Sequence, residues 1–106
     1  MPATMTMEQR QMVVALSGEL DHHGTERMRE EIDAMAEKEH PPELVLDFGR
    51  VEFMDSSGIG LVLGRYRLMQ ELGGRLILRN LPPHIRRVMR VAGIENLEIR
   101  EEGAKQ

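Results

Sequence analysis

The sequence contains no cysteine and no tryptophan, and it has only one tyrosine and two phenylalanines among 106 residues. Without cysteine the chain cannot form a disulfide, and it offers no thiolate ligand for a zinc ion or an iron–sulfur cluster. With so few aromatic rings, the core must be assembled from aliphatic side chains and from the nine methionines, which fill irregular spaces well.

Long apolar runs are absent as well. No segment approaches the ~18 consecutive apolar residues of a membrane-spanning helix, and no basic-then-apolar leader opens the chain. A chain of 106 residues has the length of one domain with its own core. We therefore expect a single domain over residues 1–106, located in the cytoplasm and not attached to a membrane.

The chain has more acidic than basic side chains, 18 against 14. The formal net charge is −4 and the pI is about 5.6, which argues against nucleic acid as a direct partner. Residues 1–50 carry 5 basic and 11 acidic side chains, whereas residues 51–106 carry 9 and 7. An acidic amino-terminal half is typical of solvated helix faces, and it also offers a surface to a partner of opposite charge.

The first half of the chain predicts a hairpin followed by a helix. Residues 4–8 alternate and residues 11–17 are largely apolar, so two strands joined at Gln9 and Arg10 are expected. Thr25 is a candidate helix cap, and apolar positions then recur at a spacing of three to four. Pro41 ends that helix.

The second half alternates strands and helices. Pro82 and Pro83 open one predicted helix, and glycines follow the ends of two predicted helices, at Gly73 and at Gly93. The predicted elements are a strand at 43–49 with side chains covering both faces, a helix from 56 to about 72, a strand at 75–80, a helix at 82–93 and a short strand at 97–100. Residues 101–106 are expected to be a frayed tail.

This order predicts an α/β domain. Strands connected through helices form parallel pairs, while the opening hairpin adds one antiparallel strand. The expected fold is a mixed sheet of four to five strands, with about three to four helices lying mainly on one face.

The segment MDSSG (54–58) carries serines that resemble nucleophiles, but the hydrolase motif Gly-x-Ser-x-Gly is not matched at Ser56 or Ser57. A Ser-His-Asp set could in principle combine a serine with His22 or His23 and with an aspartate. Such combinations arise easily from composition alone, so catalysis is not the favoured interpretation.

Glycine spacing raises a second alternative, a small nucleotide-binding domain that uses the turn 58–64. A strand is followed at the helix start by Gly58, Gly60 and Gly64. The dinucleotide fingerprint requires its third glycine at position 63, which is a leucine in this chain. The phosphate-loop signature Gly-Lys-Ser/Thr is absent. Close approach of the helix to the sheet or to a partner is the simpler reason for glycines four residues apart.

Histidines raise the question of a metal. His22 and His23 are adjacent, whereas His40 and His84 are distant in the sequence. Two histidines need further ligands to hold a metal, and an exposed loop after a strand is their ordinary environment. We expect no metal and no cofactor.

A helix start at Asp55 or Ser56 has a chemical consequence. We expect Asp55 or Ser56 to cap the first amides, and a serine hydroxyl at this helix start to lie exposed at the positive end of the helix dipole. Free amides and the dipole both suit an anion. A phosphate on Ser56 is therefore expected to leave the fold intact while adding charge to the surface.

The segments GELDHH (18–23) and FMDSSGIGLVLGRY (53–66) together resemble the STAS-domain anti-sigma factor antagonists of bacteria, most nearly those of the sporulation sigma F branch. The resemblance extends over nearly the whole chain and is loose after Gly93. It implies a mixed sheet with helices on one side and a partner-switching role without catalysis. A STAS scaffold or sensor component is the alternative within the family.

The resemblance implies two protein partners. An anti-sigma factor that is also a serine kinase would bind the unphosphorylated chain, and a PP2C-type phosphatase would reset the phosphorylated form. Ser56 corresponds to the phosphate acceptor. The other residues that the resemblance assigns to partner binding are Asp21, His22, His23, Asp55, Ser57, Gly58, Gly60 and Gly64.

Overall fold

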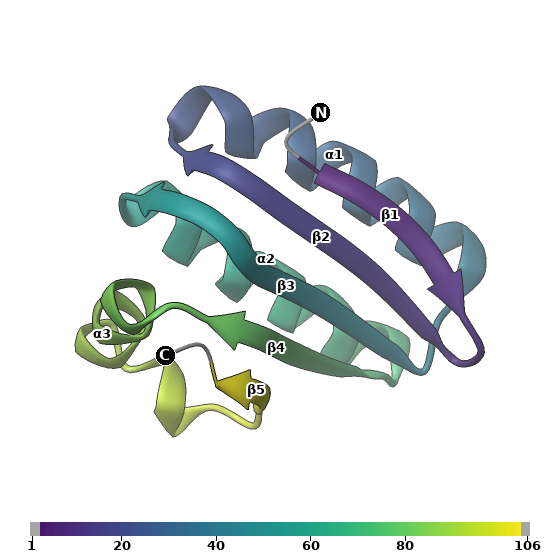
Figure 1. Ribbon diagram of the computed structural model, residues 1–106. Coiled ribbons are helices and arrows are strands. Elements are labelled where there is room, and N and C mark those ends of the chain that lie inside the picture. Colours follow the sequence, from purple (N-terminus) through teal and green to yellow (C-terminus); the bar gives the residue numbers. More distant parts are fainter. Residues whose placement is uncertain (1–2, 105–106) are drawn as a thin grey trace.

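The computed structural model describes residues 3–104, and it has a five-stranded sheet with two long helices packed against one face (Figure 1). The elements in chain order are β1 (Ala3–Glu8), β2 (Gln11–Leu20), α1 (His22–Glu39), β3 (Glu43–Met54), α2 (Ser56–Leu72), β4 (Arg75–Leu81), α3 (Pro83–Val91), the 3₁₀ helix η1 (Ile94–Asn96) and β5 (Arg100–Ala104).

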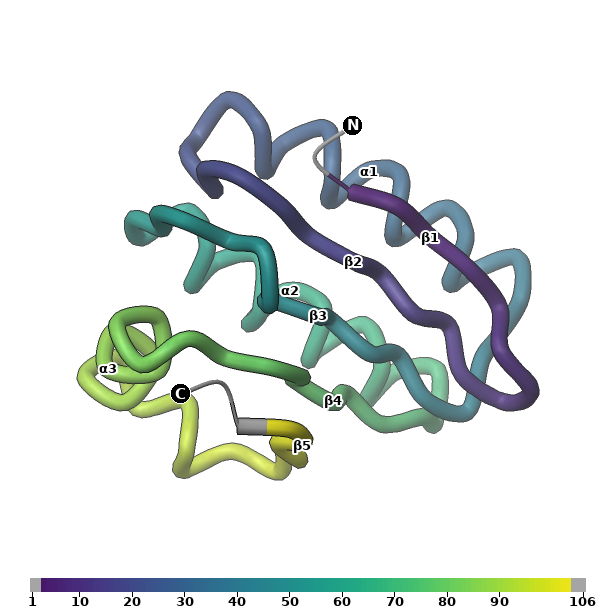
Figure 2. The backbone as a smooth tube through the Cα atoms, in the orientation of Figure 1, coloured from purple at the N-terminus to yellow at the C-terminus, as the bar shows by residue number. Residues whose placement is uncertain are grey.

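The strands lie in the sheet in the order in which they occur in the chain, β1-β2-β3-β4-β5. β1 pairs with β2 antiparallel, and every later pair is parallel because a helical connection returns the chain to the same end (Figure 2). The expected α/β class, the amino-terminal hairpin and the mixed sheet are confirmed. None of the helices within residues 3–104 is long and apolar enough to cross a membrane.

Three predicted boundaries up to the end of β3 were wrong. α1 begins at His22 with Asp21 as its cap, four residues earlier than a cap at Thr25 would allow, and Thr25 is buried within the helix. β2 and β3 continue to Leu20 and Met54, beyond the predicted ends at 17 and 49. Pairing with a neighbouring strand sustains these extensions, which contain glycine and polar residues that a periodicity argument discounts.

The predicted carboxyl-terminal end was also wrong. The last strand is Arg100–Ala104 rather than 97–100, and it pairs with β4 from Ile77 onward. Residues 101–104 therefore belong to the sheet instead of a frayed tail, because the edge of β4 offers them hydrogen-bonding groups. Residues 105–106 lie outside the described part of the chain.

The main core lies between the sheet and the helices. Alternate residues of β3, namely Leu44, Leu46 and Phe48, are fully buried on this side. Met28 and Ile32 from α1 cover them together with apolar side chains of α2. Methionines and leucines dominate this core, as the shortage of aromatic residues requires.

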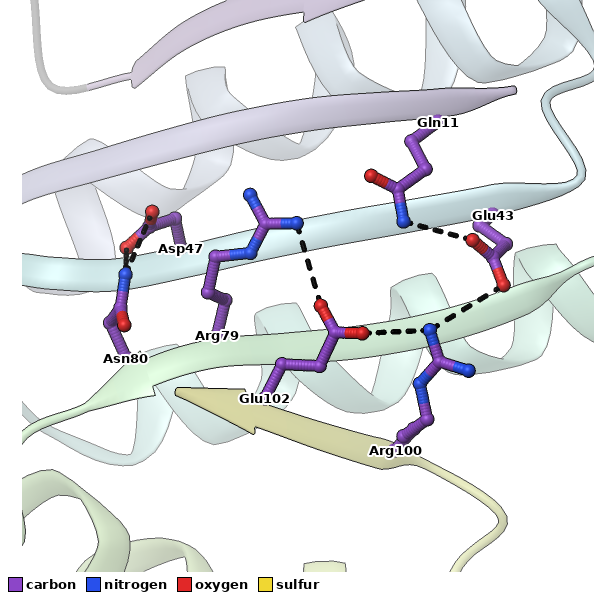
Figure 3. Close-up of polar contacts among 7 residues, drawn as sticks. All are labelled: Gln11, Glu43, Asp47, Arg79, Asn80, Arg100 and Glu102. Carbon is purple, nitrogen blue, oxygen red and sulfur yellow. Dashed lines mark hydrogen bonds and ion pairs between the residues drawn. The ribbon is translucent and has the colours of Figure 1, made fainter. Parts of the chain in front are cut away.

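The opposite face of the sheet carries a buried apolar row with no helix over it. Val13, Val45 and Ile77 are paired across β2, β3 and β4, and all three are buried. By strand register, Gln11 and Glu43 precede this row and Asp47 and Arg79 follow it. Figure 3 shows these polar side chains on the face turned away from α1 and α2. β3 is thus covered on both faces, as predicted, although polar groups form the second cover.

Those polar side chains are connected to one another. Arg100 lies 2.8 Å from Glu102 and 3.7 Å from Glu43, and the side chain of Gln11 donates to Glu43 at 2.9 Å. Arg79 contacts Glu102 at 3.5 Å. The long stems of such residues lie over apolar surface while their charged ends stay in water, so the network links β2 to β5 across the apolar row.

One buried ion pair joins α1 to α2. Arg65 is 4% exposed; its Nε lies 2.8 Å from Oδ1 of Asp33, and its Nη1 donates to the carbonyl of Leu61 at 3.3 Å. Burial raises the pKa of Asp33 and lowers the pKa of Arg65, and the attraction between them opposes both shifts. The pair links α1 to α2, and removal of either partner would leave the other charge without its counter-ion.

A double-mutant cycle tests this view of the ion pair. Asp33→Ala leaves a buried guanidinium without its anion, so we expect the free energy of unfolding to fall by about 2 kcal/mol. The loss stays moderate because the carboxylate is partly exposed. The double variant Asp33→Ala/Arg65→Met should cost clearly less than the sum of the two single changes, as measured by urea unfolding. Additive costs would show that the two side chains do not depend on each other.

Candidate functional site

The two motifs, GELDHH (18–23) and MDSSG (54–58), meet at the carboxyl-terminal ends of β2 and β3. In the parallel pairing of β2 with β3, Leu20 lies opposite Met54, so Asp21 and Asp55 leave neighbouring strands at the same level. The backbone N–H of Asp55 donates to the carbonyl of Leu20 at 3.4 Å. Figure 1 shows α1 and α2 both starting at this edge, next to the arrowheads of β2 and β3.

Each aspartate caps the helix that follows it. Oδ1 of Asp21 accepts the N–H of Gly24 at 2.9 Å, and Oδ1 of Asp55 accepts the N–H of Ser57 at 2.8 Å. Both aspartates have extended backbones, the conformation that aims a short carboxylate at the first free amides. Of the two caps that the sequence allowed for α2, the structure selects Asp55.

Ser56 is the first residue of α2, and its side chain is exposed. Ser57 is half-buried. The amides of Ser57 and Gly58 both donate to Asp55, one to its carboxylate and the other to its carbonyl at 3.0 Å. The expectation that these amides are free for an anion is therefore wrong, because Asp55 occupies them. The helix dipole still favours a phosphate on Ser56.

His22 and His23 lie exposed in the first turn of α1, and not in a loop as the sequence indicated. His40 ends the same helix, and Nε2 of His84 in α3 lies 2.9 Å from the carbonyl oxygen of Glu52. Within residues 3–104 no group of three or more histidine and carboxylate side chains converges as a metal site would require.

The three glycines of α2 have different surroundings. A Cβ on Gly58 would lie 2.0 Å from Cγ of Met54, so this glycine lets the start of α2 pack on the end of β3. A Cβ on Gly60 or Gly64 would meet nothing within 4 Å. These two glycines are therefore not needed for contact with the sheet, and Gly60 lines a shallow cleft of about 130 Å³ between α1 and α2.

An apolar groove adjoins Ser56 on its other side. It has a volume of about 420 Å³ and lies between the start of α2 and the outer face of α3. We call it the α2–α3 groove, and its lining residues are Asp55, Ser56, Ile59, Arg87, Val88, Val91 and Ala92. Val91 is 84% exposed, and Phe53 at the end of β3 is 52% exposed. Such a patch beside polar residues is typical of a protein-binding surface.

Sequence reasoning missed the α3 side of this groove. Ile85 and Met89 face the core, while Val88 and Val91 occupy the outer face, where a surface helix usually carries polar residues. Two valines on the otherwise basic face of an amphipathic helix were the available signal. Nothing in the sequence placed that face next to Ser56, since the two lie about thirty positions apart.

Two substitutions in α2 test the different roles of the glycines. Gly60→Ala adds a methyl group to open space in a helix, so we expect a gain of about 0.5–1 kcal/mol in the free energy of unfolding. Gly58→Ala forces Met54 aside and should cost about 1–3 kcal/mol. Thermal and urea unfolding measure both changes. Equal effects of the two alanines would contradict the assignment of Gly58 to packing.

Comparison with known proteins gives this geometry a context. A family model described as "Mlab, STAS domain" matches residues 3–101. A curated relative from Lysinibacillus sphaericus, named anti-sigma F factor antagonist, is 41% identical over 83 residues, which are 78% of this chain and 71% of the relative.

Two solved structures extend the likeness to the fold. The anti-sigma factor antagonist SpoIIAA in its unphosphorylated form has a TM-score of 0.82 at 37% identity, covering 93% of this chain and 86% of that one. The Bacillus cell fate determinant SpoIIAA in its phosphorylated form has a TM-score of 0.72 at 36% identity, covering 93% and 89%. By matched domain, sequence identity and fold, the chain belongs to the STAS-domain family, among the anti-sigma factor antagonists.

Proposed function

We propose that this chain is a phosphorylation-controlled switch that acts in the cytoplasm on an anti-sigma factor. The unphosphorylated chain binds an anti-sigma factor that is also a serine kinase, and the sigma factor is released. The kinase then transfers the γ-phosphoryl group of ATP to Oγ of Ser56, giving ADP and a proton. A PP2C-type phosphatase hydrolyses the phosphoester and restores the active form. The chain is a substrate and a binding partner, and it supplies no catalytic group.

The position of Ser56 is the observation that carries this proposal. Its side chain is exposed at the edge of the sheet where the GELDHH and MDSSG segments meet. The hydroxyl can be reached without unfolding any element, because Ser56 is the first residue of α2 and Asp55 performs the capping. A relative of known structure occurs in unphosphorylated and phosphorylated forms, which supports the same chemistry here.

Electrostatics accounts for release of the partner. A phosphate adds nearly two negative charges, and it would do so directly beside the carboxylate of Asp55. That carboxylate already accepts the N–H of Ser57, so this amide does not compensate the new charge, which stays on the contact surface. An anionic group of the partner at Ser56 is then repelled, and an apolar group there is disfavoured because contact would bury the charge, while the fold is retained.

The surface around Ser56 has two sides that suit one partner. Asp21, with His22 and His23 after it, is exposed at the start of α1, so a basic side chain of the anti-sigma factor would be attracted there. The α2–α3 groove on the other side receives an apolar side chain of the same protein. Gly60, exposed between these regions, permits the partner's backbone to approach closely.

The first test of this function is phosphorylation itself. We expect incubation with the cognate anti-sigma kinase and ATP to add one phosphate of ~80 Da at Ser56, as located by mass spectrometry of peptides. Ser57→Ala is the matched control and should still be modified, whereas Ser56→Ala should not. Binding is measured in parallel: Ser56→Ala should bind and resist release, and Ser56→Asp should lose binding with an unchanged circular dichroism spectrum. Modification that persists in Ser56→Ala would sink the proposal.

The α2–α3 groove gives a separate prediction. Val91→Ser should change the free energy of unfolding by less than about 0.5 kcal/mol, since the side chain is mostly exposed. Its affinity for the anti-sigma factor should fall about tenfold if a partner side chain packs on Val91. Met7→Ser removes another exposed apolar side chain, on β1, and serves as the control in calorimetry. Equal affinities of the two variants would exclude the groove from the interface.

A further inference from the structure

The start of α2 has little capacity to hold a phosphate on Ser56 by itself. The amides of Ser57 and Gly58 are occupied by Asp55, and the carboxylate of Asp55 repels a second anion. In proteins a phosphoserine that orders its surroundings generally contacts an arginine or a set of free amides. A cationic partner for this phosphate must therefore come from another element.

Arg87 of α3 has the right position for that role. Among the described residues that line the α2–α3 groove, it is the one cationic side chain, and Ser56 belongs to the same lining. The rest of the lining is mostly apolar and consists of Asp55, Ile59, Val88, Val91 and Ala92. An ion pair formed against apolar walls is screened less by water than one on an open surface.

Arg87 also differs from the arginines next to it. Arg86 contacts Glu101 at 3.4 Å, and Arg90 contacts Glu95 at 3.6 Å. Within residues 3–104, Arg87 forms no ion pair, and its side chain is exposed. Its guanidinium is therefore free to bind a new anion, and the planar fork of N–H groups matches a phosphate in two-point contact.

We propose that Arg87 is the residue that binds the phosphate of phosphorylated Ser56, forming an ion pair across the α2–α3 groove. This inference rests on the proposed function in one respect, namely that Ser56 is the phosphorylated residue. The ion pair bridges α2 and α3 at the groove and thereby obstructs access to Val88 and Val91. Phosphorylation then removes an apolar docking surface in addition to placing negative charge next to the partner.

The ionisation of the phosphate reports on this contact directly. Phosphoserine can be incorporated at position 56 during translation, so the kinase is not needed. A pH titration followed by ³¹P NMR then gives the second pKa of the phosphate, which is about 6 when it is exposed. Loss of a neighbouring cation disfavours the dianion. We expect this pKa to rise by roughly half a unit in Arg87→Gln, while Arg87→Lys keeps part of the effect.

Arg90→Gln is the matched control, since it removes an equal charge from the same helix at a residue outside the groove lining. It should raise the pKa much less than Arg87→Gln. A second readout needs no substitution: the Nε–H resonance of Arg87 in the phosphorylated chain should shift with the same pKa as the phosphorus signal. An Arg87 resonance that ignores the titration, or equal pKa values in the two variants, would overturn the proposal.

The two proposals fail in different ways. If the kinase does not modify Ser56, the proposed function is rejected. The NMR titration of the incorporated phosphoserine still tests whether Arg87 binds the phosphate. If the kinase modifies Ser56 and the titration shows no dependence on Arg87, the switch remains and the role of Arg87 is rejected.

Discussion

The parallel pairing of β2 with β3, in the register that sets Leu20 opposite Met54, is the constraint on which the site depends. It places the two capping aspartates side by side and starts α1 and α2 from one edge of the sheet. Earlier along the same two strands Val13 pairs with Val45 on the opposite face, and two irregularities, between Ala15 and Ser17 and between Gly18 and Glu19, shift the register before Leu20. A slip by one residue turns the side chains of a paired segment to the wrong face, so core packing fixes the register of the first segment and the two irregularities carry it to the site.

The site combines a hydrogen-bonded, packed helix start with the exposed hydroxyl group of Ser56. Asp55 accepts the N–H groups of Ser57 and Gly58 in the first turn of α2, and Gly58 lets that turn pack against Met54. Ser56 is thereby left with no structural task except to begin the helix. A residue in that situation can change its charge state by modification at little cost to folding, which is the property that a switch of this kind needs.

The surroundings of Ser56 differ in character from one side to the other. The α1 side presents the exposed Asp21 within an acidic half of the chain, and the α3 side presents valines together with Arg87. A negative charge added between them meets repulsion on one side and an uncommitted cation on the other. Under the proposed function, phosphorylation of Ser56 would change contacts within the protein together with contacts to the partner.

Local patterns in the sequence determined the α/β class, the hairpin, the helix beginning near Ser56 and the membership of the STAS family, because each follows from periodicity, capping residues and short motifs. Tertiary structure alone decided that Asp21 starts a helix, that Arg100–Ala104 forms a strand and that Arg65 pairs with Asp33. It also decided that α3 lies beside Ser56. These features depend on contacts between residues distant in the chain, which are fixed only when the sheet brings its strands into register and the helices bury their apolar faces.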